Sequence, residues 1–134
     1  IELVRETCEA TGFGIPVEFS PSALLNEKVG ADRDPYYVLG ACNPQMADRA
    51  LDASDGRIGA LFPCNLIVWQ ESPGRQRVYH VSIMRVARLV GLAPDDDVWD
   101  DIVADTGDLV DEFFDRLADH EDATYPVPAA RREQ

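Results

Sequence analysis

Basic residues are scarce in this 134-residue chain, which has 12 Lys plus Arg against 25 Asp plus Glu and a formal net charge of −13. Binding to a nucleic-acid backbone needs cations that neutralise phosphates, so this balance argues against a nucleic-acid partner. Three cysteines are too few for a secreted scaffold held by several disulfides. No apolar run approaches the roughly 20 residues that cross a bilayer, and no basic start leads into a signal segment. We therefore expect a soluble, cytoplasmic protein without membrane contact.

Several motifs that carry well-known chemistry are also missing. The sequence has no glycine-rich phosphate loop, no Gly-x-Ser-x-Gly elbow and no Cys-x-x-Cys pair, and the acidic run 95–101 lacks the ordered spacing of a calcium loop. Cys42, Cys64 and His80 could supply three soft ligands, but they lack the short spacing of a zinc site. We predict neither a metal site nor a cofactor.

The acidic residues are concentrated near the end of the chain. Residues 1–94 carry a net charge of −2 and residues 95–134 a net charge of −11. Such a surface repels itself in dilute buffer, whereas molar salt shortens the screening length to about 3 Å. The charge therefore favours adaptation to high salt, and an acidic tail that docks on a basic partner is the alternative.

Hydrophobic periodicity predicts a mixture of strands and helices. Alternating apolar residues at 13–19 indicate a half-buried strand, and Pro16 indicates that it lies at an edge or carries a bulge. Gly107 predicts a kink or break in the last helix. We expect one α+β domain over residues 1–122 and a frayed tail at 123–134. The predicted strands are 13–19, 36–42, 58–62, 64–70 and 78–83, and the predicted helices are 1–11, 21–29, 44–51, 84–90 and 96–119.

A repeated Cys-Asn pair is the most distinctive feature. Cys42-Asn43 ends one predicted strand and Cys64-Asn65 begins another, so pairing of these strands would bring both thiols to one end of the sheet. We identify Cys42, Asn43, Cys64 and Asn65 as candidate ligand-binding residues. A cysteine nucleophile would need a base, and His80 and His120 are the candidates. Structural cysteines in the core, with asparagine shaping the turns, and a disulfide are the alternatives.

The order of four segments, "GFG", "PYYVLGACNPQMADRAL", "IGALFPCNLIVW" and "VSIM", resembles the domain-of-unknown-function 302 family over roughly residues 1–118. The resemblance implies a TATA-binding-protein-like α+β fold, with a curved antiparallel sheet of four to five strands, helices on one face, and commonly a homodimer. It implies no established reaction. The chain departs from the family at His80, where an aliphatic residue is expected, and in starting without the usual opening strand. The hallmark residues correspond to Pro35, Tyr36, Gly40, Cys42, Asn43, Pro44, Pro63, Cys64 and Asn65.

Three functions follow from these observations. The first is a non-catalytic homodimeric module that binds a small ligand near Cys42 and Cys64. The second is a thiol-dependent enzyme or sulfur carrier that uses one of these cysteines. The third is a structural or interaction protein, for which an exposed patch of Tyr36, Tyr37 or Trp69 would be evidence.

Overall fold

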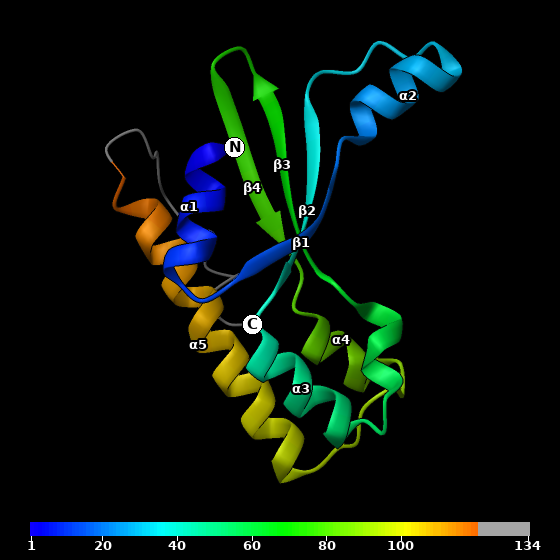
Figure 1. Cartoon of the computed structure of the whole chain (residues 1–134), viewed down its shortest axis with the longest axis vertical. Coiled ribbons are helices and arrows are strands. Elements are labelled where there is room, and N and C mark those ends of the chain that lie inside the picture. Colours follow the sequence, from blue (N-terminus) through cyan, green and yellow to red (C-terminus); the bar gives the residue numbers. More distant parts are fainter. Residues whose placement is uncertain (121–134) are drawn as a thin grey trace.

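A single antiparallel sheet organises the chain, and its strands follow one another in space in the same order as in sequence (Figure 1). The computed structural model describes residues 1–120. Helices and strands are mixed in this part of the chain, which confirms the predicted α+β class and a sheet of four strands. The strands are β1 (Gly14–Phe19), β2 (Tyr36–Cys42), β3 (Cys64–Ser72) and β4 (Arg75–His80).

Most of the helices begin at a residue that caps them. The side chains of Ser20, Asn43, Ser82 and Asp96 each accept the backbone N–H three residues further on, which satisfies a donor that the first turn leaves free. The elements are α1 (Glu2–Ala10), α2 (Pro21–Val29), α3 (Pro44–Ala53), the 3-10 helix η1 (Arg57–Leu61), α4 (Ile83–Leu89) and α5 (Asp97–Ala118). Within residues 1–120, no helix has both the length and the apolar character needed to span a membrane.

Two predicted strands were wrong in whole or in part. The segment 58–62 forms most of η1 instead of a strand, because Asp55 and Gly56 turn the chain with positive φ and Ser54 then accepts the N–H of Ile58. β4 ends at His80 instead of continuing to residue 83, because Ser82 caps α4. α5 continues through Gly107 without a break, which corrects the predicted interruption. The predicted tail 123–134 lies outside the described residues.

The sheet register confirms the position predicted for Pro16. β1 lies at one edge of the sheet, and its pairing with β2 is irregular between Gly14 and Val17, on either side of the proline. Proline cannot donate a ladder hydrogen bond, so an edge strand with a local irregularity accommodates it. The two central strands, β2 and β3, also pair with each other, and at one end of this pair Ala41 of β2 lies opposite Cys64 of β3.

Two apolar clusters share α5. The first lies between the sheet and the helices α1 and α5, and the second lies between α3, η1, α4 and the N-terminal half of α5 (Figure 1). Phe113 and Phe114 of α5 belong to the first cluster, whereas Trp99 and Ile102 belong to the second. Leu109 packs against both. One long amphipathic helix therefore joins the two halves of the molecule.

Candidate functional site

The two Cys-Asn pairs meet at one end of the sheet, as the sequence predicted. Cys42 is the last residue of β2 and Cys64 is the first residue of β3, and these strands are neighbours. Side chains alternate between the two faces of a strand, so Cys64 lies on the same face as its partner Ala41, which belongs to the cluster beneath α1 and α5. The ligand-binding role of these residues stays a prediction.

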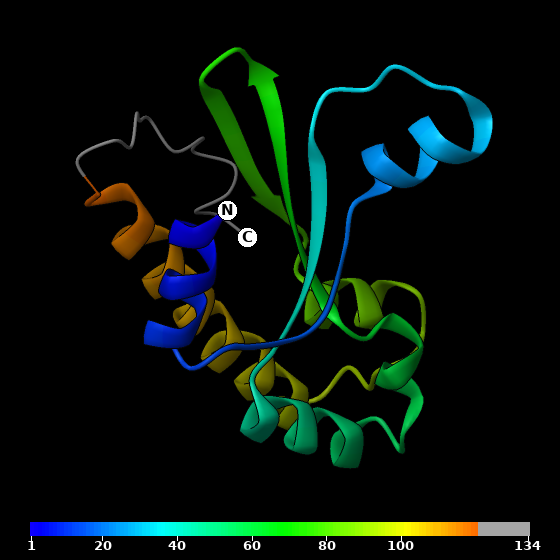
Figure 2. The same ribbon diagram turned by 45° about the horizontal axis from the view of Figure 1, so that its top comes forward.

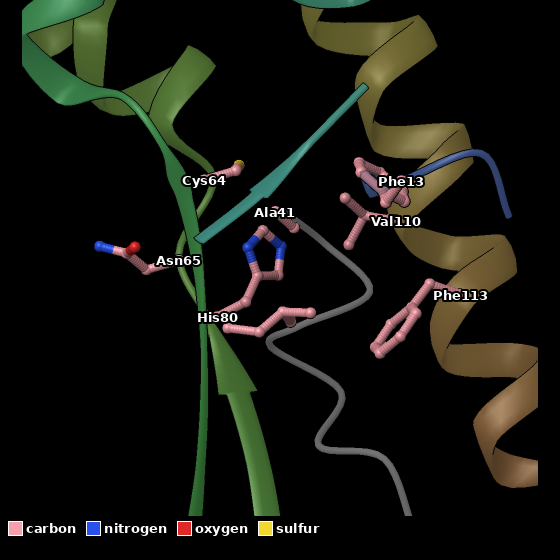
Figure 3. Close-up of a pocket in the computed structure, with 8 residues that line it drawn as sticks. Phe13, Ala41, Cys64, Asn65, His80, Val110 and Phe113 are labelled. Carbon is pink, nitrogen blue, oxygen red and sulfur yellow. The ribbon is translucent and has the colours of Figure 1, made fainter. Parts of the chain in front are cut away.

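A small pocket lies at this end of the sheet, between its covered face and α5 (Figure 3), with an empty volume of about 300 Å³ that includes space open to solvent. Most of its wall is apolar, and the aromatic rings of Phe13 and Phe113 face it from two separate segments. Cys64 and His80 are the side chains on its wall that have reactive or titratable groups. The lining residues are Phe13, Ala41, Cys64, Asn65, Leu66, His80, Val110 and Phe113.

Burial controls the chemistry of the Cys64 thiol. Removal from water raises the pKa of Cys64, and the nearby Cys42 adds a smaller effect in the same direction. A backbone hydrogen bond with Ile83, the first residue of α4, acts in the opposite direction but does not outweigh burial. The thiol is therefore held in its neutral form more strongly than a cysteine in water.

His80 reaches the pocket from β4. It lies opposite Leu66 of β3, and Figure 3 shows its ring on the side of the sheet that faces α5. The ring also stacks on Phe114 of α5, with ring centroids 6.0 Å apart. His120, the other histidine considered from the sequence, follows the end of α5 and does not line this pocket.

The two asparagines have different environments. The side-chain oxygen of Asn43 accepts the N–H of Met46, and its amide donates to the carbonyl of Gly12, each at 3.0 Å. Asn43 therefore caps α3 and ties it to the turn before β1. Asn65 is exposed, and its amide points away from Phe13 and Phe113 in Figure 3. Cys64 and Asn65 border the pocket, whereas Cys42 and Asn43 do not.

Sequence reasoning missed the aromatic and aliphatic part of the pocket. Val110 and Phe113 were recognised as part of the apolar stripe of a helix, but periodicity does not show which strands that stripe packs against. Phe13 was assigned to a strand, although β1 begins at Gly14. No local signal in the sequence would have placed these three residues around one space.

The raised pKa leads to a test by alkylation. Less thiolate is present at a given pH when the pKa is raised, so Cys64 is expected to react with iodoacetamide more slowly in the native protein than in the urea-unfolded chain. Rates at each cysteine are measured by peptide mass spectrometry between pH 7 and pH 10. Cys8 is the internal control, because burial raises the pKa of this core thiol to about 11. Faster labelling of Cys64 in the native state would contradict the assignment.

The raised pKa of Cys64 also makes the stability of the fold depend on pH. A group whose folded pKa exceeds its unfolded value stabilises the fold below the unfolded pKa, about 8.5 for cysteine, and this contribution is lost as the pH rises through the folded value. Cys64→Ala is therefore expected to lose less stability than the wild type when the pH is raised above about 8.5 in urea titrations. An identical loss in both proteins would show that Cys64 titrates normally.

Metal ligands are not grouped in the described part of the chain. Within residues 1–120, no three His, Cys, Asp or Glu side chains lie together in a way that could hold a metal ion.

Comparison with known proteins identifies the family of the chain and a related structure. The family model described as "Domain of unknown function DUF302" matches residues 1–117. The crystal structure of an uncharacterized conserved DUF302 protein from Bacillus stearothermophilus is similar, with a TM-score of 0.72 and 29% sequence identity. The similarity covers 86% of this chain and 85% of the other. No curated protein matches the chain.

Proposed function

The chain belongs to the DUF302 family, whose function is unknown, and we propose that it is a binding module that holds one small apolar ligand in the pocket between the sheet and α5. Ligand sites are concave and mostly apolar, with a few polar groups that orient the ligand. The wall has this composition, because apolar side chains form most of it, and Cys64 and His80 lie on its sheet side (Figure 3).

The observation that carries this proposal is the combination of an apolar wall and a thiol kept neutral by burial. The empty volume of about 300 Å³ includes space open to solvent, and the room inside it for the centres of water-sized groups is only about 20 Å³, so the ligand is a molecule of few heavy atoms. An ionised ligand would lose its hydration against Phe13, Leu66 and Phe113, and the wall has no Asp, Glu, Lys or Arg side chain to pair with it. A neutral aromatic or branched aliphatic molecule suits the site best.

A second function is favoured by one specific observation. Cys64 and His80 border the same pocket, and a cysteine nucleophile is commonly activated by a histidine. A thiol-dependent enzyme or sulfur carrier that uses Cys64 would need its thiolate to be favoured, whereas burial raises the pKa of Cys64. Retention of ligand by Cys64→Ala would support the binding module, whereas its loss together with a covalent adduct on the wild-type thiol would support the second function.

Blocking the pocket tests the binding function. We expect benzene, toluene or indole to shift the amide resonances of Phe13, Leu66 and Phe113 in a two-dimensional NMR titration. Val110→Phe fills the pocket from α5 and is expected to raise the Kd of these probes about tenfold or more. A tenfold change in Kd corresponds to a loss of about 1.4 kcal/mol of binding free energy.

The matched control lies seven residues earlier on the same helix. Val103 is also half-buried, but it packs against the second cluster and does not line the pocket. Val103→Phe is expected to leave the affinity within about twofold of the wild type. Equal weakening by both variants, or shifts confined to other regions, would refute the assigned site, as would the absence of binding by all three probes.

A further inference from the structure

We propose that the pocket selects ligands that carry a single hydroxyl group, which binds between the Cys64 thiol and the His80 imidazole. This ligand class rests on the binding function proposed above and specifies it, because the site is the same pocket. Its members are small uncharged alcohols with a compact apolar body, and phenol is the simplest aromatic one.

The sheet register places the two polar side chains beside each other. His80, the last residue of β4, lies opposite Leu66 of β3, and Cys64 lies two residues before Leu66 on the same strand. Side chains two residues apart on a strand share a face, so all three face the covered side of the sheet. Diagonal neighbours of this kind lie about 7–8 Å apart, and hydrogen bonds span about 3 Å. One oxygen atom between the two side chains can therefore contact both.

The His80 ring is held in place from the opposite side of the pocket. α5 runs along the covered side of the sheet (Figure 2), and its Phe114 stacks on the ring with centroids 6.0 Å apart and planes inclined by 26°. Figure 3 shows the ring extended from β4 into the space between the sheet and Val110. A neutral imidazole has one nitrogen that donates and one that accepts, so it can serve a ligand and a protein group at the same time. The ring supplies the acceptor for a ligand O–H.

The Cys64 thiol supplies the complementary donor. Burial raises the pKa of Cys64, so the proton stays on the sulfur at neutral pH. The sulfur is in a hydrogen bond with the backbone of Ile83, whose N–H is the donor because this contact lowers the thiol pKa. The S–H group is a weak donor that this contact does not use. A hydroxyl group both donates and accepts, so it matches the imidazole and the thiol together.

The rest of the wall limits the ligand to one polar group. Phe13, Leu66 and Phe113 present apolar surface, and the amide of Asn65 points away from the two phenylalanines (Figure 3). Among the lining residues of the described chain, none is Asp, Glu, Lys or Arg. A second polar group on the ligand would lose its hydration against this surface without a partner. The wall therefore favours a single hydroxyl on an apolar body.

Phenol and toluene test this selection, because they have nearly the same shape and differ in one group. In a wholly apolar pocket phenol is the weaker ligand, since its hydroxyl loses its hydrogen bonds to water. We expect the wild type to bind phenol with a Kd no higher than that of toluene, measured by NMR titration. His80→Phe keeps a ring against Phe114 but removes the acceptor. It is expected to raise the Kd of phenol about tenfold and to leave the Kd of toluene within about twofold.

His120→Phe is the matched control, because His120 follows the end of α5 and does not line the pocket. We expect its ratio of phenol to toluene affinity to stay within about twofold of the wild type. The nitrogen resonances of the His80 ring supply a measurement that needs no variant, since phenol is expected to shift them more than toluene does.

The outcomes separate this inference from the function on which it rests. Tighter binding of toluene than of phenol by the wild type would overturn the hydroxyl selection and leave the binding module in place. An equal effect of His80→Phe on both ligands, or equal shifts of the His80 ring by both, would do the same. Absence of binding by both molecules would overturn the selection and the binding function together.

Discussion

Trp99→Ala is expected to lower the free energy of unfolding by about 3–5 kcal/mol, a large part of the total for a chain of this size. Trp99 is fully buried in the second cluster, beside side chains of α3, η1 and α4. Its indole N–H donates to the carbonyl of Met84 at 2.8 Å. The alanine variant would leave a cavity at the centre of this cluster and remove the indole hydrogen bond to that buried carbonyl.

Urea unfolding followed by circular dichroism at 222 nm measures this change without relying on tryptophan fluorescence. Trp99→Phe is the matched variant, because it keeps an aromatic ring but removes the indole donor, and a loss of about 0.5–1.5 kcal/mol is expected from the missing hydrogen bond to Met84. If Trp99→Ala costs less than about 1 kcal/mol, the second cluster does not have the packing described above.

Gly40→Ala is expected to destabilise the protein by about 1–3 kcal/mol through steric overlap. A Cβ atom at this position would lie 2.5 Å from Cγ of Pro63 and 3.2 Å from Cβ of Val17. The proline ring and the neighbouring strand have little freedom to move aside. Since Pro63 directly precedes Cys64, the same change should displace the thiol and speed its alkylation in the native state.

The control for this substitution is Gly107→Ala. The added methyl group at residue 107 meets no atom within 4 Å, and alanine favours a helix interior over glycine, so a gain of about 0.5–1 kcal/mol is expected. Both variants are compared by thermal and urea unfolding in the same salt. Equal stability of Gly40→Ala and the wild type would mean that Pro63 can withdraw from the sheet at no cost.

Local patterns in the sequence were sufficient where a segment's own residues decide its structure. Ser20-Pro21 and Asn43-Pro44 predicted the starts of α2 and α3, and the structure has a capping side chain and a first-turn proline at each. Pro16 predicted an edge strand for the same reason, since the missing N–H excludes a central position.

Local sequence patterns gave wrong predictions where contacts between distant segments determine the structure. The run at 58–62 has the composition of a buried strand, but Ile58 is buried by α3, α4 and α5 instead of by sheet neighbours, and a short apolar run does not distinguish the two. The position of Cys42 and Cys64 at the same end of the sheet was predictable, because it follows from the pairing of two adjacent strands. The pocket wall was not, since it depends on which turn of α5 faces β2 and β3.

The shared position of α5 has a consequence for how the molecule loses its structure. Its N-terminal half packs in one cluster and its C-terminal half in the other, with Leu109 against both. If one half of α5 unfolds, the remaining turns of the helix lose packing partners. Subglobal opening is therefore costly, and the regions on either side of Leu109 are expected to exchange as one foldon in hydrogen-exchange measurements instead of as two independent ones.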